Sequence, residues 1–273
     1  MTPLVVMVAP NGARRTKADH PRLPMTAEEL AEEAAACVAA GATLIHLHVR
    51  DAAGAHVLDV DLYRAATDAV RRRVGDRMVV QVTTEAVGRY RPDQQIAVVR
   101  ALHPEAVSMA LGELIPDDAA TDEATELLAW LQRERIAPQF ILYTPAEVIR
   151  FHELRRRGVI PQARPFVLFV LGRYTEPAEV RPRDVLPYLK AHDADFPWAV
   201  CAFGRAETAC VLTAAGLGGH VRVGFENNLW LPDGSRAESN ADLVTRVVAG
   251  AQLVGRPIAD IATTRALLAE TAV

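Results

Sequence analysis

Two histidines, His46 and His48, stand one residue apart in the mostly apolar stretch 43–51. The stretch is rich in β-branched residues, a pattern that predicts a β-strand. Side chains alternate between the faces of a strand, so both imidazoles should point to the same side, about 6–7 Å apart along the chain. Imidazoles placed in this way can bind one metal ion and leave its other positions for a carboxylate and a substrate. The alternative is a pair of buried histidines that only form hydrogen bonds, and the adjacent Arg50 and Asp51 favour the metal site.

Short apolar runs alternate with amphipathic stretches along the whole chain. The expected strands cover residues 4–9, 43–51, 78–83, 106–111, 139–143, 166–171, 198–203 and 220–225. The expected helices cover residues 26–40, 61–74, 92–102, 121–134, 145–157, 182–192, 207–215 and 240–254, and a last short helix covers 262–273. Strands joined by helices must be parallel, and eight such units predict a single (β/α)₈ TIM barrel over residues 1–273. A doubly wound open sheet is the alternative, but the turn at residues 10–13 lacks the GxGxxG pattern.

Composition excludes several classes of partner. With 273 residues, 50% of them hydrophobic, the chain can bury one large core. Its net charge of −4 argues against nucleic acid or an anionic membrane as a partner, and no apolar run approaches the roughly 20 residues that span a bilayer. Cys37, Cys201 and Cys210 form no CxxC pair, so we expect reduced, buried thiols in a cytoplasmic protein.

The chemistry of a TIM barrel lies where its strands end and the βα loops begin. The residues expected at that mouth include Asn11, His46, His48, Arg50, Thr83, Glu85, Ser108, Glu113, Tyr143, Arg205, Arg222, Glu226 and Asn227. The last strand closes onto the first, so Glu226 can reach the two histidines and complete a set of ligands common for catalytic zinc. Arg222 can hold a substrate carboxylate. The alternative for both residues is a structural ion pair inside the barrel.

Several sequence blocks together resemble the β-keto acid cleavage enzymes over nearly the whole chain. They are P-x-T-x-E-E-L at 24–30, A-G-A-x-x-x-H-L-H-V-R-D at 40–51, F-V-L-G at 169–172, G-R at 204–205 and G-G-H-V-R-V-G-x-E-x-N-L at 218–229. The resemblance implies a zinc-dependent barrel that reacts a β-keto carboxylate with acetyl-CoA, giving acetoacetate and a new acyl-CoA. It also implies His46, His48 and Glu226 as zinc ligands and Arg222 as the active-site arginine. Members are typically homo-oligomers, so we expect a homodimer or homotetramer.

The chain departs from that family where acid–base chemistry is expected. Asn227 stands where the family usually has a proton-accepting aspartate, and an amide cannot act as a general base. Ile141 aligns with a family glutamate. Glu85 and Glu113 replace small neutral residues after the third and fourth strands. Either they face solvent, or one of them supplies the missing base or receives a cationic group of the substrate, and Glu85 is the preferred base.

The leading hypothesis is therefore zinc-dependent β-keto acid cleavage with altered acid–base residues. Its catalytic residues would be Arg222, Asn227, Glu85 and Thr83, and its substrate-binding residues would be Asn11, Arg50, Ser108, Glu113, Tyr143 and Arg205. One alternative is a barrel that binds a metal and a carboxylate without turnover. The other is a zinc-dependent hydrolase or lyase that does not use CoA.

Overall fold

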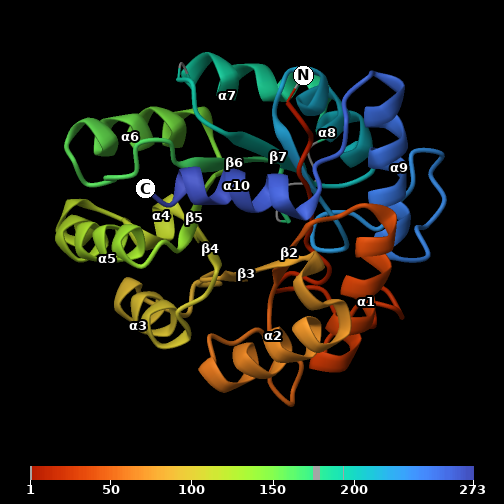
Figure 1. Cartoon of the computed structure of the whole chain (residues 1–273), viewed down its shortest axis with the longest axis horizontal. Coiled ribbons are helices and arrows are strands. Elements are labelled where there is room, and N and C mark those ends of the chain that lie inside the picture. Colours follow the sequence, from red (N-terminus) through yellow and green to blue (C-terminus); the bar gives the residue numbers. More distant parts are fainter. Residues whose placement is uncertain (1, 175–178, 193) are drawn as a thin grey trace.

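The computed structural model describes residues 2–174, 179–192 and 194–273, and these residues form a closed barrel of parallel strands surrounded by helices (Figure 1). The strands follow one another in chain order, and the eighth pairs with the first. They are β1 Val6–Val8, β2 Leu44–Leu47, β3 Val79–Thr83, β4 Ala106–Ala110, β5 Ala137–Leu142, β6 Phe166–Leu171, β7 Trp198–Ala202 and β8 His220–Val223. The prediction of a TIM barrel is confirmed.

The helices fall close to the predicted ranges. The α-helices are α1 Ala27–Ala40, α2 Val60–Val74, α3 Pro92–Leu102, α4 Leu111–Leu114, α5 Thr121–Arg133, α6 Pro145–Arg156, α7 Leu186–Ala191, α8 Glu207–Gly216, α9 Asn240–Leu253 and α10 Ile261–Thr271. Short 3₁₀ turns cover Gly75–Arg77, Asp118–Ala120 and Pro182–Val185. Thr26 caps α1, and the side chain of Glu29 reaches back to the Thr26 backbone to form a capping box. The short helix α4 was not predicted.

The strands are buried on both faces, which explains their nearly continuous apolar sequences. In β2, Ile45 and Leu47 pack outward against the helices, whereas Leu44 points into the barrel. The interior has an apolar layer around Met7, Leu44 and Phe166. His46 lies two residues after Leu44 and points in the same inward direction. Its side chain therefore lies between the apolar layer and the carboxyl end of the barrel.

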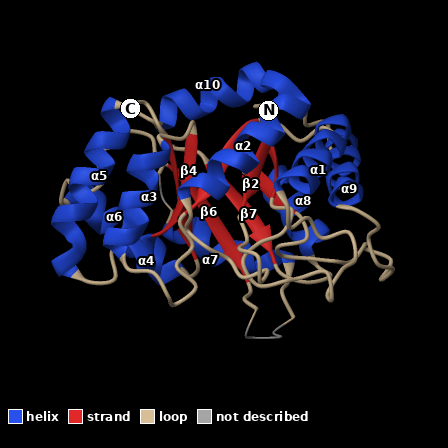
Figure 2. Cartoon of the chain, turned by 90° about the horizontal axis from the view of Figure 1, so that it is seen from below, coloured by secondary structure: helices blue, strands red, loops and turns tan. Residues whose placement is uncertain are grey.

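Helix α10 crosses the amino end of the barrel, opposite the end where the long loops gather (Figure 2). Leu268 of its last turn and Ala272, just after the helix, pack into the apolar interior cluster. Thr264 and Thr43 share a hydrogen bond of 2.7 Å between their hydroxyls. The expected terminal helix thus covers one end of the barrel.

Some strands end earlier than predicted. β2 stops at Leu47, so His48 lies one residue beyond it, because the side chain of Asn11 contacts the backbone of His48 where a strand partner would bond. β8 stops at Val223 instead of residue 225, because the chain turns at Gly224. Its φ of +139° suits glycine, and a Cβ there would lie 2.3 Å from the Ala9 carbonyl oxygen.

The strands β5 and β7 also end earlier than predicted. Tyr143 and Phe203 lie one residue past β5 and β7 instead of inside them. The three cysteines are free and buried, as expected. Among the described residues, no helix is both long enough and apolar enough to cross a membrane.

Candidate functional site

Three possible metal ligands converge at the carboxyl end of the barrel. His46 Nε2 lies 3.5 Å from Glu226 Oε2, and His48 Nε2 lies 3.3 Å from the same oxygen. The two Nε2 atoms are 3.1 Å apart, and the three donor atoms all lie within 4.8 Å of one another. Glu226 Oε2 accepts no hydrogen bond from the described residues although it is buried. A cation among these atoms would satisfy it, so His46, His48 and Glu226 (the metal site) fit a metal ion.

His46 is oriented by polar side chains inside the barrel. Its Nδ1 lies 2.9 Å from Gln81 Oε1 and 3.2 Å from Ser108 Oγ. Gln81 in turn donates from Nε2 to Gln139 Oε1 at 3.3 Å. Because an amide oxygen only accepts, Nδ1 of His46 carries the proton and Nε2 is left with a lone pair directed at Glu226.

The surroundings of the metal site set the protonation states of its three side chains. Burial, together with the charge of Arg222, lowers the pKa of His46 to about 4. Burial also holds the pKa of His48 well below its usual value. For Glu226, burial acts to raise the pKa, but Arg222 and the two histidines outweigh it and lower the pKa. The site therefore presents two neutral imidazoles and an ionised carboxylate at neutral pH, the protonation states that metal binding requires.

The turn after β8 brings Glu226 to the histidines. Glu226 lies beyond the end of β8 and meets Arg222, whose Nη2 donates to Glu226 Oε1 at 2.8 Å. Gly12 lies directly against Glu226, since a Cβ on Gly12 would be 2.5 Å from the Glu226 Cγ. The buried Glu207 accepts hydrogen bonds from the Gly224 N–H and from Asn228, which holds the turn in place.

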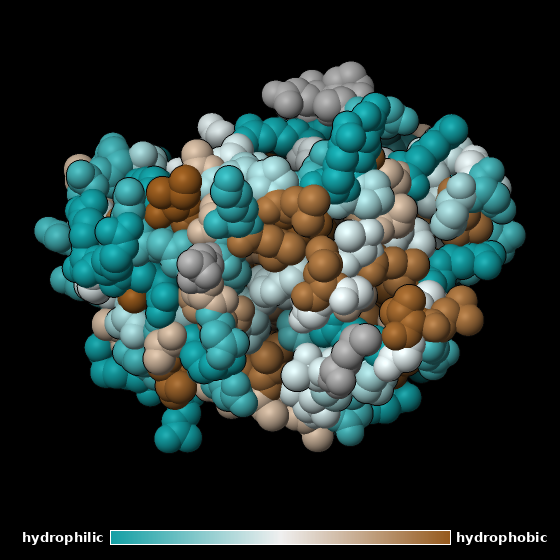
Figure 3. Space-filling view, turned by 90° about the horizontal axis from the view of Figure 1, so that it is seen from above, coloured by the Kyte–Doolittle hydropathy of each residue, from teal (hydrophilic) through white to brown (hydrophobic). Residues whose placement is uncertain are grey.

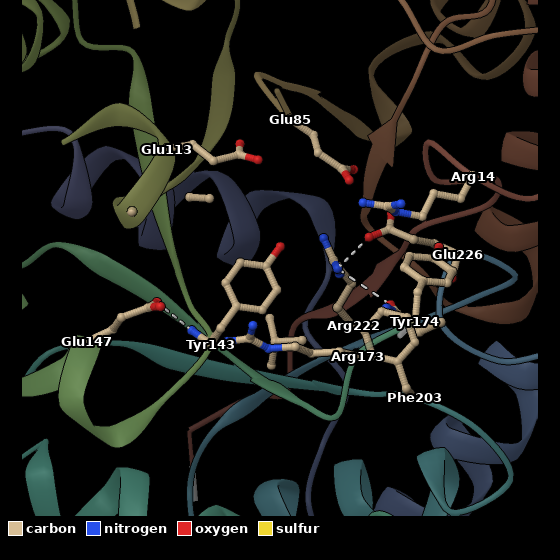
Figure 4. A pocket seen from close by; sticks show the side chains of 14 residues that line it. Arg14, Glu85, Glu113, Tyr143, Glu147, Arg173, Tyr174, Phe203, Arg222 and Glu226 are labelled. Atoms are coloured by element: carbon tan, nitrogen blue, oxygen red, sulfur yellow. Dashed lines mark hydrogen bonds and ion pairs between the residues drawn. The ribbon is translucent and has the colours of Figure 1, made fainter. Parts of the chain in front are cut away.

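A pocket of about 330 Å³ opens beside the metal site (Figure 4). Arg222, Glu226 and Asn227 line one side of it. Arg222 is 2% exposed, and its Nε and Nη1 atoms have no hydrogen-bond partner among the described residues. The Nδ2 of the buried Asn227 is also unpaired there. These donors can bind the oxygens of an anionic ligand.

The two unusual acids, Glu85 and Glu113, both line this pocket. Glu85 Oε2 lies 3.7 Å from His48 Nδ1. Burial, with Glu226 and Glu113 nearby, raises the pKa of Glu85 to about 8, and burial raises the pKa of Glu113 as well. Neither acid stands free on the surface, because both are partly buried.

Of the other predicted residues, Tyr143 lines the pocket. The rest lie around the pocket and do not line it. Ser108 contacts His46, and Thr83 Oγ1 accepts the Glu85 N–H at 3.1 Å. Arg50 donates to backbone carbonyls of neighbouring loops, including that of Gly54 at 2.9 Å. Asn11 holds the His48 backbone, and the exposed Arg205 lies over the Trp230 ring in a neighbouring pocket. Substrate binding by Asn11, Arg50, Ser108 and Arg205 stays a prediction.

Gln81 and Tyr174 were not predicted as residues of the site. Gln81 orients His46, and its one signal is a polar side chain inside the apolar strand Val79–Thr83. Tyr174 lines the pocket, and its hydroxyl donates to the Glu226 carbonyl oxygen. Nothing in its sequence surroundings marks it.

The chain is similar to known proteins over nearly its whole length. A family model described as beta-keto acid cleavage enzyme matches residues 3–269. The 3-keto-5-aminohexanoate cleavage enzyme of Fusobacterium nucleatum is 31% identical over 95% of each chain. The 3-oxoadipate:acetyl-CoA acetyltransferase of Cupriavidus necator is 30% identical over 97% of this chain and 94% of its own.

Solved structures share the fold. The apo structure of ObcA matches with a TM-score of 0.71 and 19% identity, covering 91% of this chain and 65% of that chain. A type I 3-dehydroquinate dehydratase from Clostridium difficile matches with a TM-score of 0.59 and 12% identity, covering 95% of both. The match of the family model over nearly all residues, with the relatives at about 30% identity, shows that this chain belongs to the β-keto acid cleavage enzyme family.

Proposed function

We propose that this protein transfers the acyl part of a β-keto acid to CoA: the β-keto acid and acetyl-CoA react to give acetoacetate and a new acyl-CoA. The convergence of His46, His48 and Glu226 beside the unpaired donors of Arg222 carries the proposal. A relative named as an acetyl-CoA acetyltransferase supports the use of acetyl-CoA. We further propose that the protein acts in the cytoplasm, where this co-substrate is available.

Zinc is the metal proposed for the site, held by the two imidazole nitrogens and the Glu226 carboxylate. When bound, zinc would serve as a Lewis acid for the carbonyl oxygen of the keto acid. Gln81 and Ser108 keep His46 in the orientation that presents Nε2. Arg222 keeps Glu226 ionised.

Arg222 is proposed to bind the substrate carboxylate and to stabilise negative charge during the reaction. Its Nε and Nη1 atoms are free to donate, and its Nη2 is bonded to Glu226. Asn227 is proposed to donate a hydrogen bond to the same substrate through its unpaired Nδ2. The amide of Asn227 cannot take the proton from the carbon between the keto group and the carboxylate.

Glu85 is the residue proposed to take that proton. Its carboxylate lines the pocket close to His48, and Thr83 holds its backbone N–H, so Thr83 acts as a positioning residue. Glu85→Gln keeps the shape and removes the base, so it should lower turnover at least about tenfold. Unchanged turnover in this variant, with its metal still bound, would contradict the role.

The function is tested by mixing the purified protein with β-keto acids, with and without acetyl-CoA, and following acetoacetate and acyl-CoA. Products that form only with acetyl-CoA would support the proposal. Products without acetyl-CoA would favour a hydrolase or lyase, and binding without products would favour a non-catalytic barrel. Metal analysis of His46→Ala tests the ligands, since full zinc content in that variant would contradict the assignment.

A homodimer or homotetramer is the proposed assembly. Figure 3 shows the side of the molecule over α7 and α8, where apolar atoms gather on an otherwise polar surface. Leu186 at the start of α7 and Leu217 after α8 are 54% and 50% exposed. Light scattering on a size-exclusion column would measure the mass, and a monomer would contradict the proposal.

A further inference from the structure

Glu113 is a fixed carboxylate with one free oxygen. It belongs to α4, the short helical turn after β4, and its Oε2 accepts the Ala86 N–H at 2.9 Å. The same Oε2 lies 3.4 Å from Nε2 of the buried Gln95, which also donates to the Thr84 carbonyl oxygen at 2.6 Å. Among the described residues, no hydrogen bond reaches Oε1. The pocket wall therefore presents an oriented acceptor that the protein itself does not use.

The negative charges of Glu113 and Glu85 on this wall of the pocket have no cationic partner close by among the described residues. No lysine or arginine in the described part of the chain lies within the 4.0 Å of an ion pair with Glu113 or Glu85. Burial raises the pKa of Glu113, and the Ala86 N–H, the Arg14 charge and Gln95 do not offset it. A cation arriving in the pocket would relieve this cost of burying negative charge.

The opposite wall is suited to an anion. In Figure 4 Glu113 lies across the pocket from Arg222, Glu226 and Arg14. The buried Arg222 and Asn227 line that side, and both carry donors that are unpaired among the described residues. Tyr143 lies between the two walls. A ligand whose carboxylate binds Arg222 would thus extend its other end past Tyr143 towards Glu113.

We propose that Glu113 binds a positively charged group on the tail of the substrate, so that the substrates are β-keto acids carrying an ammonium group. This inference rests on the proposed function and names its substrate class. Family membership leaves the tail charge open, because the relatives' names include both an amino-substituted and a dicarboxylic keto acid. The arginines of the pocket do not favour an anionic tail here, because Arg14 and Arg173 are exposed and lie against the rings of Tyr174 and Tyr143.

The test compares three substrates of equal carbon number: 3-oxohexanoate, its 5-amino derivative and 3-oxoadipate, with neutral, cationic and anionic tails. The holoenzyme should show a kcat/KM for the amino compound about ten- to hundredfold above that for 3-oxohexanoate, the range expected for a hydrogen bond to a charged group. Glu113→Gln should bring this ratio close to one. Glu113→Lys should move the preference to 3-oxoadipate.

Glu147→Gln is the matched control. Glu147 lines the same pocket, but its Oε2 accepts the Tyr143 N–H at 2.7 Å and so serves the backbone. This variant should retain the preference for the amino compound. Metal content and melting temperature, measured for every variant, show whether the fold and the metal site are intact.

The outcomes separate this inference from the proposed function. Turnover of the keto acids without preference for the amino compound, or a preference that Glu113→Gln leaves unchanged, would overturn the inference alone. Turnover of none of the three with acetyl-CoA would overturn the proposed function instead. In that case, calorimetry measures the binding of the amino and unsubstituted compounds to the wild type and to Glu113→Gln. If the wild type binds both compounds with equal affinity, or if Glu113→Gln keeps the wild-type preference, the role of Glu113 is refuted.

Discussion

Gln81 sets the direction of His46: its Oε1 lies 2.9 Å from His46 Nδ1 and leaves Nε2 facing Glu226. The contact is formed inside the barrel, where both side chains are at most 1% exposed. A buried amide that can only accept at this atom selects one tautomer of the imidazole. A residue outside the ligand set thus decides which nitrogen of His46 a metal would meet.

Gln81→Leu should weaken metal binding about 10- to 100-fold, the usual loss when the partner of a ligating histidine is removed. Zinc titration calorimetry measures the affinity. Gln139→Leu is the control, because Gln139 bonds to Gln81 and not to His46. An affinity lowered equally in both variants would indicate a general disturbance of the interior instead.

Gly12→Ala should displace Glu226, because the new Cβ would lie 2.5 Å from the Glu226 Cγ. We expect a loss of metal affinity in addition to the roughly 1–2 kcal/mol that a left-handed backbone costs alanine. Gly158→Ala separates the two effects. Its φ of +78° is similarly left-handed, and nothing lies within 4 Å of its new Cβ. It should destabilise the fold in urea unfolding and leave zinc affinity at the wild-type value.

Acid should destabilise the protein partly through His220. The Val5 N–H donates to His220 Nδ1 at 3.1 Å, which requires a neutral ring. Burial and the Arg256 charge lower the pKa of His220 to about 3 from 6.5. Between these pH values the unfolded chain takes up a proton that the folded protein does not. The contribution to stability is complete above pH 6.5 and falls by up to about 1.4 kcal/mol per pH unit below it.

His220→Asn removes this titration and keeps an acceptor for Val5. The loss of unfolding free energy from pH 6.5 to pH 5 should therefore be about 2 kcal/mol smaller than in the wild type. Glu207, whose pKa burial raises to about 8, changes stability in the opposite direction but equally in both proteins. His103→Asn, at an exposed histidine, should keep the wild-type difference between the two pH values.

Metal removal should lower the melting temperature. Without a metal, Glu226 Oε2 would be buried with no hydrogen bond from the described residues, and a ligand that binds only the folded state stabilises that state. A chelator should therefore lower the melting temperature of the wild type and have no effect on His46→Ala. Equal melting temperatures of the wild type with and without chelator would argue against a resident metal.

The barrel was predictable because each strand is buried on both faces and each helix on one, so the sequence alternates clearly between two patterns. The metal ligands were predictable because His46 and His48 share a short motif and because a barrel brings β8 beside β1. The strand ends were not predictable, because they depend on residues that are distant in the sequence. Asn11 takes the place of a strand partner for His48, and Ala9 lies close to Gly224. Gln81 and Tyr174 were missed for the same reason, because their roles arise only from contacts across the barrel.

Helix α10 blocks the amino end of the barrel with Leu268 and Ala272, so in the described structure the pocket communicates with solvent from the loop side. Under the proposed reaction, two substrates and two products then share a single passage. A slowly departing acyl-CoA would hold the next keto acid outside. We therefore expect the release of product, and not the bond-breaking step, to limit the steady rate, with a burst of acetoacetate in the first turnover.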